Sequence, residues 1–197
     1  MLLLLHGGEA HGFTLFGYDL PRMHAVINDL PILLVVAVLF EVIYLISKRD
    51  GFRLVSFWML MSGAVGGALA VISGLLAEDH IDHGEAIHEI MEHHETLALW
   101  TLGIFGVVAL WRIFRERKMT QGERIAALLL AFVGTGFLAA TGSEGGEMVF
   151  EHAAGTPTDD MQSELKDRAA GHTHGEMEEE DHDHDKAAPA HTDSAAH

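Results

Sequence analysis

The residues best suited to chemistry in this sequence are its histidines, which number 15 among 197 residues. Neutral imidazole is a common ligand of transition metals and of haem iron. The chain has no cysteine, which excludes disulfides, thiolate metal sites and covalent haem attachment through a CxxCH motif. Any metal must therefore be held by nitrogen and oxygen ligands.

Five histidines and seven acidic residues lie together between residues 78 and 95, a segment without lysine or arginine. If the part after Gly84 is helical, its side chains recur at i,i+3 and i,i+4, about 5–6 Å apart at Cβ. Imidazole and carboxylate at this spacing suit copper, zinc, iron or nickel. The alternative is a solvated acidic linker with incidental histidines. The candidate metal ligands are His80, His83, His88, His93, Glu85 and Glu89, with His152 later in the chain.

The elements that must position these residues are four apolar runs, at about residues 30–47, 54–77, 97–114 and 125–141. A bilayer core of about 30 Å needs about 20 helical residues. Stretches such as AVISGLLA are apolar all round, whereas helices of soluble bundles keep a polar face. The sequence therefore predicts an all-α fold, an integral membrane bundle of four transmembrane helices.

The positive residues predict the orientation of this bundle. Lys48, Arg49 and Arg53 follow the first run, and a second basic group from Arg112 to Arg124 follows the third, while the middle loop has no positive residue. By the positive-inside rule the first and third loops are cytoplasmic. Both termini, the middle loop and all 15 histidines then lie on the extracytoplasmic side.

Two histidines stand apart from the acidic loop. His24 lies one or two turns before the first apolar run, and His94 stands at the head of the third. Both runs start from the outer side, so the two imidazoles could face each other across the mouth of the bundle. Two histidines on different helices are the minimum protein ligands of a six-coordinate haem b. The alternative places each imidazole in the headgroup layer as an ordinary interfacial residue.

Glu41 is the only acidic residue within an apolar run. An ionisable group in a membrane helix is costly unless it is paired, so Glu41 is a candidate for a functional or bundle-facing role. The alternative is that it reaches out toward Lys48 or the headgroups. No nucleophile, base and orienting group occur together, so the sequence does not indicate an enzyme.

The chain divides into an extracytoplasmic segment at 1–23, a transmembrane domain at 24–155 and a tail at 156–197. The tail contains twelve acidic, three basic and many alanine and histidine residues, with no apolar periodicity. Such a composition buries too little apolar surface to offset the entropy of folding, so we expect a disordered, histidine- and acid-rich tail. The short apolar opening has no basic residues before it, and we expect no cleaved leader.

Four motifs give the chain a resemblance to a known family: MHAVINDLPILL at the first helix, SGLLA closing the second, a histidine leading the third, and GGEMVFEHAAG after the fourth. They resemble a widespread bacterial four-helix membrane domain of unknown function, which in some proteins is fused to Rieske-type iron-sulfur domains. The resemblance implies a bacterial inner membrane and redox partners. That family has a histidine just before its Phe-Pro or Leu-Pro pair, where this chain has Asp29, so no ligand role transfers to that position.

These observations favour a non-enzymatic membrane protein that holds a haem b or a transition metal at its outer mouth. His24 and His94 are the expected cofactor ligands, and electron transfer or metal handling is the expected role. The expected partners are the lipid bilayer and a redox membrane complex, with no nucleic acid. The alternative is a structural or assembly subunit of a larger membrane complex, in which the histidines are incidental.

Overall fold

A computed structural model describes residues 18–78, 80–81 and 85–171 of the chain. The described residues are almost entirely helical. Two compact units divide between Pro157 and Thr158. The helices are α1 (Leu20–Ile27), α2 (Ile32–Ser47), α3 (Asp50–Glu78), α4 (Glu85–Arg115), α5 (Gln121–Phe150) and α6 (Thr158–Ala169).

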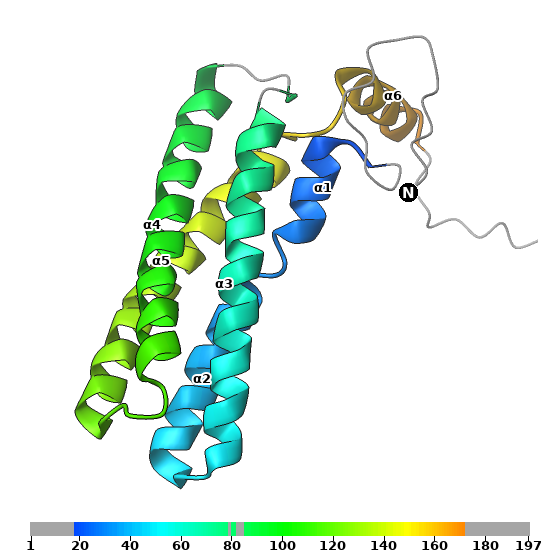
Figure 1. The fold of residues 1–197 in the computed structure, drawn as a ribbon. Helices are drawn as coiled ribbons and strands as arrows, with labels where there is room; N and C mark the ends of the chain where they lie inside the picture. The colour runs from blue at the N-terminus through cyan, green and yellow to red at the C-terminus, as the bar shows by residue number, and fades with distance from the viewer. Residues whose placement is uncertain (1–17, 79, 82–84, 172–197) are drawn as a thin grey trace, which may run out of the picture. The chain divides into compact units, whose positions relative to one another are not determined.

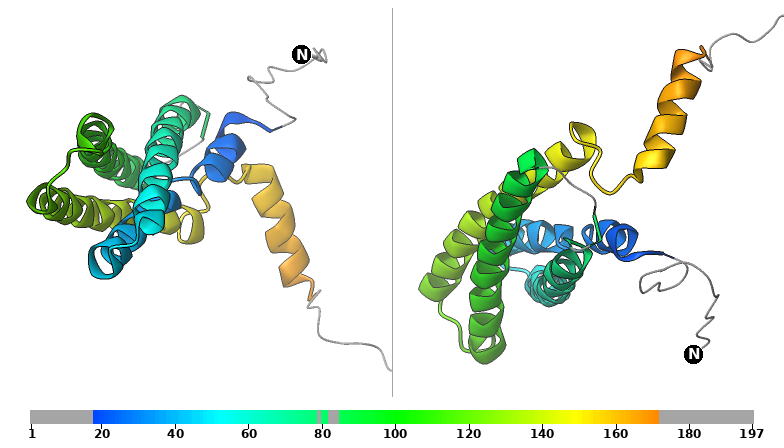
Figure 2. Two further views of the ribbon diagram at one scale, coloured as in Figure 1. Left: turned by 60° about the horizontal axis from the view of Figure 1, so that its bottom comes forward. Right: turned by 90° about the horizontal axis from the view of Figure 1, so that it is seen from above.

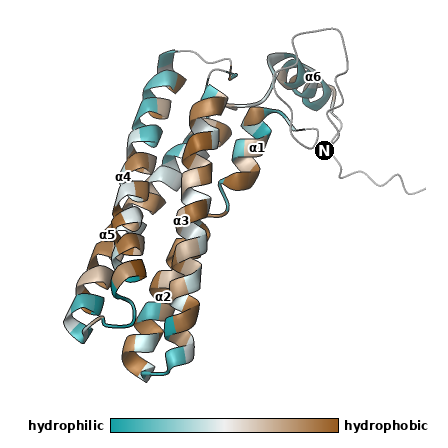
Figure 3. Ribbon diagram, in the orientation of Figure 1, coloured by the Kyte–Doolittle hydropathy of each residue, from teal (hydrophilic) through white to brown (hydrophobic). Residues whose placement is uncertain are grey.

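The first unit has four helical segments long and apolar enough to cross a membrane: Leu20–Ser47, Asp50–Glu78, Ile87–Arg115 and Gln121–Phe150. Their apolar residues occupy the middle of each long helix, while polar residues gather at the ends (Figure 3). The prediction of an all-α bundle with four transmembrane helices is confirmed. The protein is therefore a multi-pass membrane protein surrounded by a lipid bilayer.

The bundle consists of two helical hairpins, α2–α3 and α4–α5, whose tight turns lie at the same end (Figures 1 and 2). Helix α3 packs against α1, α2 and α4, and α5 packs against α4 and α2. Glycine permits the closest approaches: a Cβ at Gly63 would lie 2.8 Å from Leu34, and one at Gly134 would lie 2.8 Å from Phe105. Leu34 and Phe105 are fully buried there and form part of the apolar core.

The segment before the first apolar run forms a helix of its own, which we did not expect. Asp19 caps the start of helix α1, and its side chain accepts a hydrogen bond of 3.0 Å from the amide of Arg22. It ends at Ile27 because Pro31 has no amide hydrogen to donate to the Ile27 carbonyl. A turn over residues 28–31 follows, and α2 starts at Ile32. His24 is thus carried by a short helix that packs on α3.

The other long helices extend beyond the apolar runs that predicted them. Helix α4 begins at Glu85 rather than near residue 97, and α5 continues to Phe150 rather than ending near residue 141. Hydropathy marks the part of a helix that lies in lipid, whereas backbone hydrogen bonding continues into the polar layer. Consequently the acidic segment after Gly84 is helical, as the metal-bridging hypothesis required.

The second unit contains α6, within the tail that we expected to be disordered. Its first turn carries Asp159 and Asp160 and its last turn Lys166 and Arg168, the charge order that favours a helix dipole. Glu164 and Arg168 add an ion pair of 2.8 Å at i,i+4. Helix α6 has no buried residue, and the order of its charges is sufficient to explain why it forms. The histidine-rich remainder of the tail and residues 1–17 lie outside the described residues.

Candidate cofactor site

His24 is held by a hydrogen bond that determines which ring nitrogen carries its proton. Its Nδ1 lies 3.0 Å from Ser73 Oγ on α3, and that hydroxyl donates its own hydrogen to the Ala70 carbonyl at 2.9 Å. Since the hydroxyl hydrogen is already used, Ser73 Oγ accepts from His24 Nδ1–H. The Nε2 atom of His24 therefore carries the lone pair that can bind a metal.

His94 is held in the same way by a different group. Its Nδ1 lies 2.9 Å from the backbone carbonyl oxygen of Thr141 on α5. A carbonyl oxygen only accepts, so Nδ1 is the protonated nitrogen and Nε2 again carries the lone pair. Metal-binding histidines characteristically donate their other ring N–H to a protein oxygen, which fixes the ring and its tautomer. Both imidazoles have this arrangement.

Glycines lie directly against both imidazole rings. A Cβ at Gly74 would lie 3.0 Å from His24 Cε1, and one at Gly145 would lie 3.2 Å from His94 Cε1. Both distances are shorter than ordinary carbon contacts of about 3.5–4.0 Å. The absence of a side chain at these two positions lets each ring lie close to the neighbouring helix.

The two imidazoles belong to one large cavity. Its volume is about 530 Å³, and both His24 and His94 line it. They come from α1 and α4 and are close enough to interact electrostatically. The cavity extends inward to Leu34 and Phe105 and is mostly apolar, and its size is within the range of about 300–1,000 Å³ typical of ligand sites. The structure thus brings together the two residues predicted as cofactor ligands.

The other candidate histidines do not join this pair. His80 is exposed and its Nδ1 lies 3.0 Å from the Leu76 carbonyl oxygen. His88 lies 3.5 Å from Glu92, and His93 lies 2.8 Å from Glu144 on α5. Glu85 and Glu89 are exposed on the first turns of α4. His83 lies outside the described residues.

Only one group of three metal-ligating residues occurs in the described ranges. It consists of Glu147, Glu151 and His152 at the end of α5, with ligand atoms within 4.8 Å of one another. Both glutamates are exposed and His152 is half-buried. His24 and His94 belong to no such group among the described residues. A metal ion between them would therefore have two protein ligands, short of the three or four of typical zinc sites.

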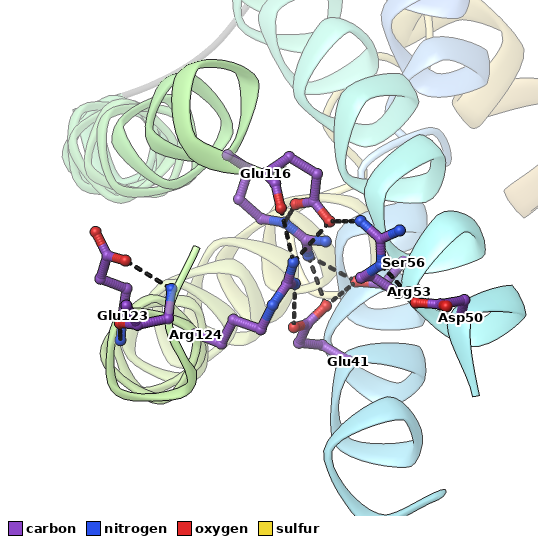
Figure 4. Close-up of polar contacts among 9 residues, drawn as sticks. Glu41, Asp50, Arg53, Ser56, Glu116, Glu123 and Arg124 are labelled. Atoms are coloured by element: carbon purple, nitrogen blue, oxygen red, sulfur yellow. Dashed lines mark hydrogen bonds and ion pairs between the residues drawn. The ribbon is translucent and has the colours of Figure 1, made fainter. Parts of the chain in front are cut away.

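Glu41 lies in a buried polar network at the end of the bundle where the hairpins turn, which we call the ionic network (Figure 4). Its carboxylate accepts hydrogen bonds from Arg112 Nη1 at 2.7 Å, Arg124 Nη1 at 3.1 Å and Ser56 Oγ at 2.8 Å. Glu41, Arg112 and Arg124 are 4–6% exposed. Glu41 therefore faces the bundle interior and pairs with arginines instead of reaching toward Lys48.

Glu116 completes the ionic network just after α4. It pairs with Arg112 at 2.7 Å, Arg124 at 3.0 Å and Arg53 at 3.1 Å. Burial of this carboxyl tends to raise its pKa, but the hydrogen bonds and charges of Arg112 and Arg124 outweigh burial and hold the pKa below its ordinary value. The ionic network thereby connects α2, α3, α4 and α5.

Sequence reasoning missed the groups that hold the two imidazoles and those that neutralise Glu41. Ser73 and Gly74 lie within the SGLLA motif; the sequence suggested only close helix packing for Gly74 and no role for Ser73. Arg112 and Arg124 were counted as loop charges in the positive-inside argument. Both arginines are ionisable residues within or beside an apolar run, and the same feature identified Glu41 as a candidate for a bundle-facing role.

The fold and this site define a polytopic membrane protein with an apolar, histidine-bearing cavity between its helices. The chain belongs to the family described as "Predicted membrane protein (DUF2231)", whose model matches residues 21–158. This range contains both imidazoles, the cavity and the ionic network. No curated protein and no solved structure matches the sequence.

Proposed function

We propose that this protein binds one haem b in the cavity, where His24 and His94 would ligate the iron, and transfers electrons to a redox partner. The observation that carries the proposal is the pair of imidazoles in one cavity, each with Nδ1–H bound to a protein oxygen and Nε2 carrying a lone pair. In bis-histidine haem the porphyrin supplies four nitrogens, so two protein ligands suffice.

The chemistry of the cavity fits haem better than a bare metal ion. Its apolar lining suits a macrocycle. Arg22, which also lines the cavity and lies 3.8 Å from Asp19, is a cation that could pair with the haem carboxylates. When bound, haem would supply a one-electron carrier. The residues of the chain would bind it, orient it and exclude water from it.

Haem content in three variants tests this assignment. His24→Ala and His94→Ala should each lose most of the haem that co-purifies with the detergent-solubilised wild type, measured per protein after conversion to the pyridine complex. His80→Ala is the matched control, because that imidazole also has Nδ1 on a backbone carbonyl but is exposed and does not line the cavity. Equal haem content in all three variants would reject His24 and His94 as ligands.

Metal handling is a second candidate function, favoured by the Glu147–Glu151–His152 group. It predicts stoichiometric zinc, copper, nickel or iron in protein without haem, and loss of that metal in His152→Ala. Protein with neither haem nor metal would favour the assembly subunit.

The orientation of the bundle in the membrane is also part of the proposal. Lys48, Arg49, Lys118 and their basic neighbours lie in or beside the two tight turns, which share one end of the bundle. We infer that this end is cytoplasmic in a bacterial inner membrane and that the cavity opens near the extracytoplasmic face. A reporter enzyme that is active only outside the cytoplasm should be active when fused after residue 197. Activity only when it is fused between Ser47 and Asp50 would reverse the orientation.

A further inference from the structure

The ionic network encloses a second, much smaller cavity. Its volume is about 20 Å³, and residues of α2, α3, α4 and α5 line it together with Met119 from the connecting turn. Four of the lining residues are polar, namely Glu41, Ser56, Arg112 and Arg124, and the others are apolar. A single water molecule needs a cavity of about 10–15 Å³ and two to four polar partners. Both conditions are met here.

Arg112, which lines this cavity, has one hydrogen-bond donor without an acceptor in the part of the chain that the structure describes. Arg112 donates from Nε to Glu116 at 2.7 Å and from Nη1 to Glu41 at 2.7 Å and Ser56 at 2.9 Å. Its Nη2 is buried and has no hydrogen-bond partner among the described residues. Arg112 is only 4% exposed, and buried donors in proteins are nearly always satisfied by protein or by ordered water.

The charges around the cavity favour a neutral ligand over an anion. The buried charges of Arg112 and Arg124 are balanced by those of Glu41 and Glu116. Arg53 has its own second partner, Asp50, at 3.1 Å. An anion in the cavity would contact the Glu41 carboxylate in a region of low dielectric constant, where like charges repel strongly. Water can accept from Arg112 and donate to a carboxylate oxygen.

We propose that this cavity is a binding site for one water molecule, which accepts a hydrogen bond from Arg112 Nη2 and donates to Glu41. The water completes the hydrogen bonding of the ionic network, which connects all four long helices. The site is separate from the haem proposal, because no described residue lines both cavities.

A crystal structure of the full chain, grown from lipid in sodium bromide at a resolution that shows ordered water, tests the proposal. We expect one water peak within hydrogen-bond distance of Arg112 Nη2 and Glu41, with no anomalous signal. An empty cavity, or an anomalous peak from bromide at the same place, would overturn it.

Two variants make the test specific. Ala127→Val adds carbon atoms to the wall of the cavity and should abolish the water peak. Ala126→Val is the matched control one residue away, on an exposed face of α5, and should retain the peak. If Ala127→Val does not fold, the electron density of the wild type and of Ala126→Val still shows whether a water molecule occupies the cavity. A peak that persists in Ala127→Val would place the water outside this cavity and contradict the proposal.

Discussion

At the scale of single residues, the proposed haem binding depends on the groups that hold the two imidazoles. Ser73 Oγ accepts a hydrogen bond from His24 Nδ1–H, and the Thr141 carbonyl accepts one from His94 Nδ1–H. Each contact determines the tautomer and the direction of the ring, so that Nε2 is available to a ligand. The partner of His94 is part of the backbone and cannot be removed by mutation, whereas Ser73 can.

Ser73→Ala is therefore the sharpest single-residue change. It removes the acceptor of His24 Nδ1–H while leaving the imidazole itself intact, and loss of such outer contacts costs about 10–100-fold in metal affinity. We expect haem affinity to fall by this order, measured by titrating haem into cofactor-depleted protein. Ser62→Ala, on an exposed face of the same helix, should bind like the wild type. Unchanged affinity in Ser73→Ala would show that the hydrogen bond does not support the ligand.

At the scale of the helices, the ionic network holds the bundle together at the end opposite α1. Removing one partner of a buried ion pair leaves the other charge uncompensated, which typically costs about 3–5 kcal/mol. We expect Glu41→Ala to lower the free energy of unfolding by this order, measured by denaturant titration in mixed micelles. Glu89→Ala is the exposed control and should change stability little. If the Glu41→Ala protein were as stable as the wild type, the ion pairs of Glu41 would make no net contribution to the free energy of unfolding.

The same network predicts how stability depends on pH. Burial tends to raise the pKa of Glu116, but the hydrogen bonds and charges of Arg112 and Arg124 together hold it below its ordinary value. A carboxyl whose pKa is lower in the folded state stabilises the fold at neutral pH, and that contribution is lost as the pH falls from the ordinary glutamate value, about 4.3, through the lowered one. The unfolding midpoint should fall with acid over this window.

Glu116→Gln removes this carboxyl and serves as the comparison. It should be less stable than the wild type at neutral pH, and the difference should shrink in acid. A constant difference between the two proteins across the window would contradict this role for Glu116.

At the scale of the whole molecule, the sequence predicted the membrane helices well. The thickness of the bilayer sets the length of each apolar run, and such a run can be recognised from neighbouring residues alone. The identity of His24 and His94 as a pair followed from their places at the outer ends of two helices. Their approach across the mouth of the bundle was expected for the same reason, but the separate helix α1 that carries His24 before the break at Pro31 was not. The roles of Ser73 and Thr141 depend on contacts between helices far apart in sequence.

The positions of Arg112 and Arg124 show a further limit of the sequence. Counting positive residues treats them as loop charges, yet both are buried against Glu41. Hydropathy cannot distinguish a charge that faces lipid headgroups from one that pairs inside a bundle. Only the packing of the two hairpins brings the three side chains together.

The central claim is that His24 and His94 together ligate one haem in the large cavity. The most direct measurement is the absorption spectrum of the purified full chain, oxidised and then reduced with dithionite, with haem counted per protein. We predict one haem per chain with the sharp reduced bands of a six-coordinate, low-spin iron, and loss of that coordination in His94→Ala. Protein expressed with ample haem that shows no Soret absorption, or a spectrum unchanged in His94→Ala, would contradict the claim.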